Sequence, residues 1–377
     1  MTYIWARQGW PRFRFDMGEA QSTLYRYAME ANALKGSVAQ LATEEQTEAQ
    51  IDLMVSEAIT TSAIEGEAYD RRDVRSSLRN QLGLNPVPEP VGDPAAHGIA
   101  ELMISVRKTF GEPLTTERLF AWHKMLMADR DLRGRMPVGA WRDRAIKIVS
   151  GPIGREAVHF EAPPPQVVPA EMDRFIGWFN ATAPKGKGSD VPGPVRAAVA
   201  HLHFECIHPF ADGNGRIGRA ISEIALSQEL GGPVLLSLSR TIEAQRKRYY
   251  DALAAASTGR LDITRWVHYF AETVLEAQFQ ARATITFVLN KARFWDRFGE
   301  RVNERQRKVL ARMFRAGPEG FGGGITAKKY VAITGASKAT ATRDLGDLLE
   351  AGALMQLPGR GRSTRYALAL EDQASRS

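Results

Sequence analysis

Apolar side chains recur at the spacing of an α-helix along most of the chain. Over residues 43–64 they fall at i, i+3, i+4 and i+7, and Gly66 stands where a helix commonly ends. Proline and glycine interrupt the pattern over residues 83–92, and helical spacing returns from residue 93 to about residue 280. The pattern therefore predicts a mainly α-helical protein.

One stretch of this helical region has the spacing of β-strands instead. Within residues 145–165, two short runs with alternating apolar positions flank the turn sequence Gly-Pro-Ile-Gly. This arrangement predicts a β-hairpin. Because an isolated hairpin cannot bury a core of its own, it either packs on the helices or serves as a lid.

From about residue 303 the pattern changes to that of a small separate module. The predicted elements are a helix, a glycine-rich turn, a short helix, a tight turn, a longer helix and two strands. Their ranges are 304–314, 320–324, 326–333, 334–336, 337–350, 354–357 and 364–368. This order predicts a winged helix-turn-helix.

We therefore expect three parts, which are an N-terminal domain over residues 1–92, a helical domain over 93–290 and the winged helix-turn-helix over 291–377. Two Trp and two Phe lie within the first 15 residues. They are predicted to form a small core or a docking segment, and a binding patch is the alternative.

The charge of the chain is concentrated near its end. The net charge is +7, and residues 303–377 hold 13 Lys and Arg against 7 Asp and Glu. A basic module on a nearly neutral body indicates an anionic partner for that module. Cys206 is the only cysteine, which excludes disulfides and Cys-based zinc sites. No apolar run approaches the roughly 18 residues of a membrane span, so we expect a cytoplasmic protein with no membrane partner.

The richest candidate chemistry lies in residues 208–219, HPFADGNGRIGR. Pro209 ends the apolar helix predicted before it, which places His208 at a helix end beside a loop. The glycines of that loop let backbone N–H groups converge on an anion, and the N-terminus of the next helix adds partial positive charge.

Three charged side chains complete the set. Arg216 and Arg219 lie three residues apart on the first turn of the next helix, so both can point toward one anion. Asp212 offers the hard oxygen that Mg²⁺ prefers. A base, a carboxylate, an amide nest and two guanidinium groups together predict a phosphoryl or nucleotidyl transfer site.

The same segment resembles the Fic motif, His-Pro-Phe-x-Asp-Gly-Asn-Gly-Arg-x-x-Arg, at every specified position. The resemblance to Fic proteins covers roughly residues 93–280. It implies a helical Fic (Fido) core with a β-hairpin flap, and transfer of AMP from ATP to a hydroxyl group of a target.

The resemblance also implies a role for each motif residue. His208 is the general base for a Ser, Thr or Tyr hydroxyl, and Asp212 holds Mg²⁺ bridging the α- and β-phosphates of ATP. Arg219 takes the γ-phosphate, and Phe210 is a core anchor. The anion hole for the α- and β-phosphates consists of Gly213, Asn214, Gly215 and Arg216.

Relatives of the Doc type, which transfer phosphate, carry Ala and Lys where this chain has Gly213 and Gly215. A lysine there would crowd the amide nest and favour another orientation of the nucleotide. Because both glycines are kept, adenylylation is the stronger interpretation.

The predicted hairpin resembles the flap of Fic proteins, which registers the target backbone by strand addition, and this favours the lid. The strand expected to line the nucleotide consists of Ala157, Val158, His159 and Phe160. Tyr249 and Ser257 lie where relatives place an aromatic and a small polar group near the adenine and ribose. For Tyr249, packing in the core is the alternative.

A second motif lies upstream. Thr61, Glu65 and Gly66 match the inhibitory pattern [Ser/Thr]-x-x-x-Glu-[Gly/Asn] of Fic proteins. Glu65 would pair with Arg219 and occupy the guanidinium meant for the γ-phosphate. A helix that merely ends in Glu-Gly is the structural alternative. In some relatives the same glutamate supports removal of AMP, so an enzyme that both adds and removes AMP is a further alternative.

The predicted winged helix carries side chains of the types that contact phosphates and base edges. They are Lys338, Thr340, Thr342 and Arg343 on the recognition helix, and Arg360 and Arg362 on the wing. DNA is therefore an expected partner, and docking of a substrate or dimerisation is the alternative.

Two classes of function compete. The first is an autoinhibited protein adenylyltransferase that uses MgATP, modifies a protein hydroxyl, releases pyrophosphate and can modify itself. The second is a DNA-binding transcriptional regulator whose Fic core senses nucleotide without turnover. The enzyme is favoured because a sensor has no need of His208. A homodimer is the family-typical expectation, and His201, His203 and Cys206 are expected to be packed in the core.

Overall fold

The computed structural model describes residues 2–128, 136–150, 157–184, 186, 190–318, 320–359 and 364–370. Contacts divide the chain into two compact units. The first unit consists of Met1–Ala33 with Gln50–Ala281, and the second of Leu34–Ala49 with Arg282–Ser377. By this division, residues 1–33 and 50–92 lie in the same unit as the helical region that follows.

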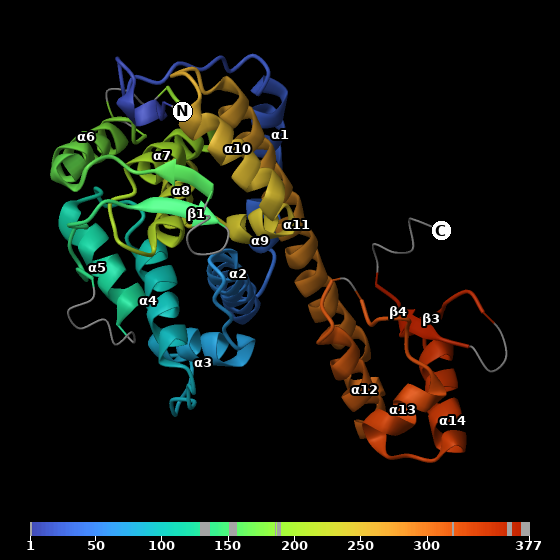
Figure 1. The fold of residues 1–377 in the computed structure, drawn as a ribbon. Coiled ribbons are helices and arrows are strands. Elements are labelled where there is room, and N and C mark those ends of the chain that lie inside the picture. Colours follow the sequence, from blue (N-terminus) through green and yellow to red (C-terminus); the bar gives the residue numbers. More distant parts are fainter. Residues whose placement is uncertain are drawn as a thin grey trace. The chain divides into compact units, whose positions relative to one another are not determined.

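Two adjacent helices form the centre of the first unit. Helices α7 (Gly193–Ile207) and α8 (Asn214–Leu230) pack against each other (Figure 1), and nearly every residue of α7 is buried. A helix that is apolar on all sides is expected at the centre of a core. The loop between these two helices carries the HPFADGNGRIGR segment.

Shorter helices surround this pair. They are α4 (Pro94–Lys108), α5 (Thr116–Met127), α6 (Val168–Ala181), α9 (Leu238–Ala244), α10 (Arg246–Thr258) and the first part of α11 (Thr264–Phe298). Side-chain caps start several of them: Asp93 accepts from the N–H of Ala95, and Thr115 from that of Arg118. The mainly helical prediction is confirmed.

The segment expected to contain strands does contain them. Strand β1 (Lys147–Ser150) pairs antiparallel with β2 (Ala157–Glu161), with an irregularity between Ile148 and Val149. The short helix η2 (Pro165–Val167) follows. The strands lie between α5 and α6 in the sequence, and α6 separates them from the two helices that flank the candidate site.

Two further helices precede this core. Helix α2 (Thr43–Ile64) has the bounds predicted from sequence, and Gly66 follows it with a φ of +85°. That angle suits glycine because it lacks a Cβ. Helix α1 (Gln21–Val38) comes before α2, and α3 (Arg71–Gln81) comes after it and packs on α4.

The N-terminal aromatic residues dock on the helical core. A short helix, η1 (Ile4–Ala6), buries Ile4, and the indole N–H of Trp5 donates to the carbonyl of Glu161 at 2.8 Å. The indole of Trp10 donates to Glu171 at 2.9 Å and lies edge-on to His203. The docking interpretation of this segment is therefore confirmed.

The second unit has the predicted order of elements. Helices α12 (Glu304–Phe314), α13 (Ala327–Thr334) and α14 (Lys338–Glu350) are followed by antiparallel strands β3 (Leu354–Gln356) and β4 (Tyr366–Leu368), and the short helix η3 (Gly299–Arg301) precedes them. Asp344 is 1% exposed and joins the three helices, because it accepts hydrogen bonds from Arg305 and from the Tyr330 hydroxyl. Among the residues described in both units, no helix is long and apolar enough to span a membrane.

Candidate active site

His208 stands directly after the last residue of α7. Its φ is +51°, and among the described residues it is the only one other than glycine with a positive φ. The left-handed conformation is uncommon for a residue with a Cβ, and residues that adopt it are enriched at functional sites. Pro209 prevents continuation of the helix, so the chain turns here and the imidazole lies at the start of the loop.

The loop from His208 to α8 is held closed by an asparagine. The side chain of Asn214 accepts from the N–H of Phe210 at 2.9 Å and donates to the carbonyl of Phe210 at 2.8 Å. Gly213 has a φ of +79° and immediately precedes the helix. Because the Asn214 side chain is satisfied within the loop, its contribution to an anion site would come from its backbone N–H. Phe210 is buried and stacks on His123, as expected for a core anchor.

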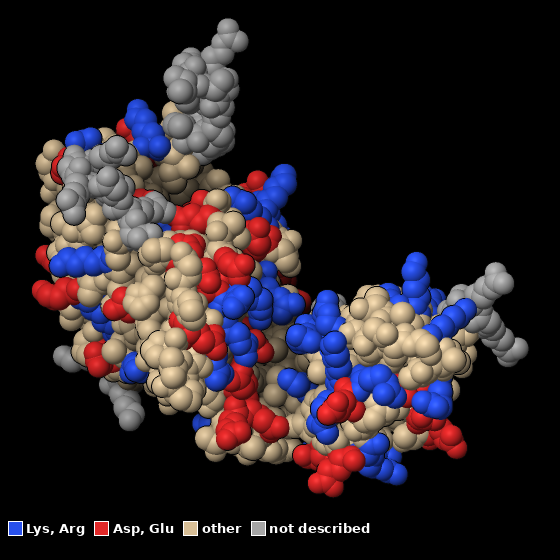
Figure 2. Space-filling view, turned by 90° about the horizontal axis from the view of Figure 1, so that it is seen from below, with Lys and Arg blue, Asp and Glu red and all other residues tan. Residues whose placement is uncertain are grey.

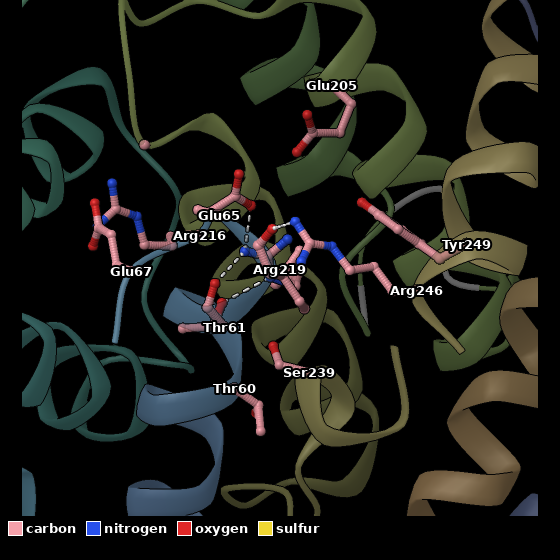
Figure 3. Close-up of polar contacts among 12 residues, drawn as sticks. Thr60, Thr61, Glu65, Glu67, Glu205, Arg216, Arg219, Ser239, Arg246 and Tyr249 are labelled. Carbon is pink, nitrogen blue, oxygen red and sulfur yellow. Dashed lines mark hydrogen bonds and ion pairs between the residues drawn. The ribbon is translucent and has the colours of Figure 1, made fainter. Parts of the chain in front are cut away.

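Arg219 is held by the end of α2. Its Nη2 lies 2.7 Å from Oε1 of Glu65, and its Nε donates to the Thr61 hydroxyl at 2.7 Å (Figure 3). The carbonyl of Thr61 accepts a further bond at 2.9 Å. Arg219 is 2% exposed, whereas the Glu65 side chain is 29% exposed, so the charge-assisted pair is shielded from water on the arginine side only. The structure thus brings the upstream motif and the second arginine of the downstream motif together.

Glu65 also covers the N-terminus of α8. A Cβ built on Gly215 would overlap Oε1 of Glu65, so the carboxylate rests directly on the backbone of the first turn. That turn exposes the unpaired N–H groups and the partial positive charge that bind anions. The Glu65 carboxylate therefore lies where an anionic ligand of α8 would lie.

Arg216 is held by a second carboxylate, which sequence reasoning missed. Its Nη1 donates to Glu67 at 2.7 Å, and the hydroxyl of Tyr69 donates to the same carboxylate oxygen at 2.5 Å. Asp212 lies 3.6 Å from Nη2 of Arg216, and its Oδ1 accepts from the N–H of Gly213 at 2.6 Å. The only local signal was an acidic residue two positions after Glu65.

Helix α2 is anchored to this unit by contacts that the sequence did not indicate either. Glu57, 4% exposed, accepts from the Ser237 hydroxyl at 2.8 Å and from the Ser239 N–H at 2.9 Å at the start of α9. At the C-terminal end of the helix, the guanidinium of Arg246 donates to the carbonyl of Ile64 at 2.7 Å. These two contacts fix the position from which Glu65 reaches Arg219.

The surroundings of His208 keep its imidazole neutral. Burial and, to a lesser extent, the charge of Arg142 lower the pKa of His208 to about 4, although Glu65 and Asp212 oppose the shift. A neutral imidazole can accept a proton at physiological pH. Glu205 lies on the same helix, with Oε2 3.8 Å from Nδ1 of His208, and burial together with Glu65 raises the pKa of its carboxyl to about 8.

The strand expected to line the nucleotide runs beside His208. The ring of Phe160 is 6.3 Å from the imidazole and is nearly buried, whereas Val158 is 49% exposed. Ala157 and His159 belong to the same strand, but their side chains lie outside the described part of the structure.

Tyr249 and Ser257 are both buried on α10. The hydroxyl of Tyr249 bonds to Nε2 of His201 at 2.7 Å, and that of Ser257 donates to the carbonyl of Ala254. These contacts favour the packing interpretation of Tyr249. His201, His203 and Cys206 are buried in α7 as expected.

The side chains expected to contact DNA lie on α14 of the second unit. Lys338, Thr342 and Arg343 are exposed, and Thr340 is partly buried. Arg360 and Arg362 lie outside the described residues. On the face seen in Figure 2, Lys and Arg side chains are interspersed with Asp and Glu.

Comparisons with known proteins agree with this site. A family model described as the Fic/DOC family matches residues 113–226, and one described as a domain of unknown function (DUF4172) matches residues 3–84. Residues 113–226 include β1, β2, α7 and the whole motif.

Two curated relatives match parts of the chain. "Protein adenylyltransferase Fic" of Culex quinquefasciatus is 38% identical over 102 residues, which is 27% of this chain and 18% of that protein. "Uridine 5'-monophosphate transferase" of Xanthomonas campestris pv. campestris is 29% identical over 119 residues, 31% of this chain and 22% of that protein. The chain therefore spans less than a quarter of the length of either relative.

A solved structure extends the likeness in fold. A Fic family protein from Desulfovibrio desulfuricans G20 superimposes with a TM-score of 0.53 at 20% identity, covering 92% of this chain and 95% of that one. The motif, the matching family model and this fold agree, and residues 113–226 of the chain form a Fic/DOC family domain.

Proposed function

We propose that the chain is an autoinhibited protein adenylyltransferase, which transfers AMP from MgATP to a Ser, Thr or Tyr hydroxyl and releases pyrophosphate. The observation that carries the proposal is the placement of a neutral His208 just before the glycine-rich N-terminus of α8, whose Arg216 and Arg219 each hold a carboxylate. The curated relatives support nucleotidyl transfer as the class of reaction.

The residues present can serve each part of that reaction. The hydroxyl oxygen of the target attacks the α-phosphorus, its proton passes to His208, and the bond to the β-phosphate oxygen breaks. Backbone N–H groups of residues 213–215 would stabilise the charge that develops on the phosphate oxygens. Arg216 and Arg219 would bind the remaining phosphates once the carboxylates now paired with them have moved.

Asp212 is suited to hold Mg²⁺ with the nucleotide. Its side chain is 39% exposed at the entrance of the loop. Within the described ranges, no group of three or more His, Cys, Asp and Glu side chains is placed to hold a metal ion. Mg²⁺ commonly takes one or two carboxylates and completes its shell with phosphate oxygens and water, so a single aspartate fits. Bound there, the ion would neutralise phosphate charge and orient the leaving pyrophosphate.

The contact between Glu65 and Arg219 supports autoinhibition. The Glu65 carboxylate already binds the Arg219 guanidinium and lies against Gly215. A phosphate group therefore cannot occupy the same place. Transfer then requires displacement of the end of α2. We further propose that β1 and β2 act as the flap that aligns the target, and that the second unit is a winged helix that binds DNA.

Transfer of label from α-labelled ATP onto protein tests the proposal, with the chain itself and a cell lysate as acceptors. Wild type is compared with Glu65→Gly in Mg²⁺, and Glu65→Gly/His208→Ala is the matched control. We expect strong labelling with Glu65→Gly, little with wild type and none with the control, which still binds ATP.

The nucleotide is varied in the same assay. Labelling from UTP instead of ATP would make the chain a uridylyltransferase, as one relative is named. Labelling only from γ-labelled ATP would identify a kinase. Binding of ATP by Glu65→Gly without any labelling would favour nucleotide sensing and overturn the proposal.

A further inference from the structure

Arg142 is a buried cation that the proposed chemistry does not use. It lies just before β1 and is 2% exposed. Among the described residues, the four hydrogen bonds of its guanidinium all go to backbone carbonyls. Burying a charge costs free energy unless hydrogen bonds compensate for the lost water. The groups that accept these hydrogen bonds therefore indicate the role of Arg142.

One side of the guanidinium holds the end of α7. Nε donates to the carbonyl of His208 at 2.8 Å, and Nη2 reaches the carbonyl of Ile207 at 3.4 Å. The backbone N–H of Arg142 donates to the carbonyl of Pro209 at 2.9 Å. The last carbonyls of a helix lack intrahelical partners and carry partial negative charge, so a cation stabilises them. Arg142 thus secures the backbone on both sides of the left-handed His208.

The other side holds both ends of the strand pair. Nη1 donates to the carbonyl of Arg144 at 2.9 Å, three residues before β1, and Nη2 to that of Pro163 at 2.5 Å, two residues after β2. The planar guanidinium presents its donors in fixed directions, and a lysine ammonium cannot reproduce them. One side chain therefore links the base of β1 and β2 to the backbone of His208.

We infer that Arg142 is a positioning residue, which keeps the imidazole of His208 in register with the strand pair that would present the target hydroxyl. This inference rests on the proposed function. Misplacement of reacting groups by about 1 Å can cost on the order of 100-fold in rate, so a rigid link of this kind matters.

Arg142 also acts on His208 through its charge. The charged groups that influence the imidazole are Arg142 before β1, Glu65 at the end of α2 and Asp212 in the loop, and a backbone hydrogen bond at Glu205 on α7 also raises its pKa. Arg142 is the cation among them and lowers the pKa of His208, whereas the carboxylates at positions 65 and 212 raise it. Removing the guanidinium should therefore raise that pKa.

The test compares Arg142→Lys and Arg142→Met in the Glu65→Gly background. Arg196→Met is the matched control, because Arg196 is 1% exposed and bonds to the carbonyl of Phe179 near the other end of α7. We expect both Arg142 variants to lose at least about tenfold in kcat, with the Kd for MgATP unchanged. Arg142→Met should also move the acidic limb of the pH–rate profile to higher pH.

The control separates positioning from folding. Arg196→Met should destabilise the fold but keep the pH profile and the rate per folded molecule. Rates of the Arg142 variants that fall only in proportion to the folded fraction, with an unshifted acidic limb, would overturn the inference.

A second readout does not depend on turnover. NMR titration of histidine-labelled protein, with the His208 signal assigned by its loss in His208→Gln, should show a higher pKa for His208 in Arg142→Met. An unchanged pKa of His208 in Arg142→Met would refute the electrostatic effect of Arg142 on the imidazole. If that pKa rises but Glu65→Gly transfers no label, only the proposed reaction is refuted.

A separate observation concerns Glu67, the carboxylate paired with Arg216. Its bonds from Arg216 and Tyr69 lie just beyond Gly66, in the same chain segment as Glu65. The two arginines of the motif are thus each paired with a carboxylate of this segment. We propose that Glu67 is a second inhibitory residue, which closes the Arg216 subsite while Glu65 closes that of Arg219. This also rests on the proposed function.

Binding of MgATP to Glu65→Gly, Glu67→Gln and the double variant tests this second proposal. We expect the double variant to bind several-fold more tightly than Glu65→Gly and to label protein at least as fast. Tyr69→Phe keeps the carboxylate and should have the smaller effect. Equal affinity of Glu65→Gly and the double variant, or weaker binding by the latter, would show instead that Glu67 merely supports Arg216. Absence of labelling with all variants, despite the gain in affinity, would count against the reaction and not against Glu67.

Discussion

His208 and Glu205 lie three residues apart, and their pKa values are shifted in opposite directions. Burial removes the charged form of both, so the imidazole has a pKa near 4 and the carboxyl a pKa near 8. Each group is therefore neutral in the folded protein around pH 7. For His208 this neutrality is what a general base requires, whereas for Glu205 it makes stability depend on pH.

Glu205→Gln tests that dependence. Between pH 4.5 and 8 the unfolded chain loses the Glu205 proton while the folded chain keeps it. The wild type therefore loses stability as pH rises through this window, and glutamine removes the loss. We expect the free energy of unfolding of Glu205→Gln, relative to wild type, to be larger at pH 8 than at pH 5 by on the order of 1 kcal/mol or more.

Urea denaturation at the two pH values measures the difference. Glu272→Gln, at an exposed position on α11, is the control. A Glu205→Gln difference that is the same at both pH values would mean that the folded carboxyl ionises normally.

At the scale of elements, α2 carries the contacts through which the proposed inhibition would act. The helix contributes Thr61 directly and Glu65 immediately after its end, and Glu57 and the carbonyl of Ile64 tie it to α9 and α10. Loosening these ties should free Arg219 without touching any residue of the motif.

Glu57→Gln is the corresponding prediction. It removes the charge that accepts the bonds of Ser237 and Ser239, and hydrogen bonds to a charged group contribute about 1.5–3 kcal/mol. We expect lower stability of about that size and faster basal labelling from α-labelled ATP than in wild type. Arg248→Met, which breaks an exposed pair with Glu272, should change neither. Reduced stability with unchanged basal labelling would mean that Glu57 supports the fold without restraining α2.

At the scale of the whole molecule, the chain has two compact units, and we propose nucleotidyl transfer for the first and DNA binding for the second. The second unit has its own apolar core, which includes Val309, Leu310 and Tyr330. Its α14 exposes Lys338 and Arg343. The same helix also exposes Asp347 and Glu350, so attraction to DNA would be moderate.

DNA binding by the full chain is checked by fluorescence anisotropy with a random-sequence duplex at several salt concentrations. We expect affinity to fall with salt, and Lys338→Ala and Arg343→Ala each to reduce the salt slope by about 1. Lys247→Ala, on α10 of the other unit, is the control. DNA binding that does not depend on salt, or no DNA binding at low salt, would favour a role of the second unit in substrate docking or dimerisation.

Local signals in the sequence determined much of the architecture. The bounds of α2 and α12 and the start of α14 after Ser337 follow from apolar periodicity, capping residues and glycines, which act within a few residues. The motif could be read for the same reason, since helix end, loop and helix start are contiguous. The pairing of Glu65 with Arg219 could be predicted only because each residue belongs to a recognisable motif, and the resemblance to Fic proteins implies that the two motifs interact.

Tertiary structure alone decided the contacts that have no local signature. Glu67 lies 149 positions from Arg216, and the Glu57 carboxylate lies 180 positions from the Ser237 hydroxyl. Arg142 reaches the carbonyl of His208 across 66 positions. Likewise, the hydrogen bond between the Tyr249 hydroxyl and His201 exists only because α10 packs on α7. A charged or polar side chain looks the same in the sequence whether it meets solvent or a distant partner, and packing of the helices makes that choice.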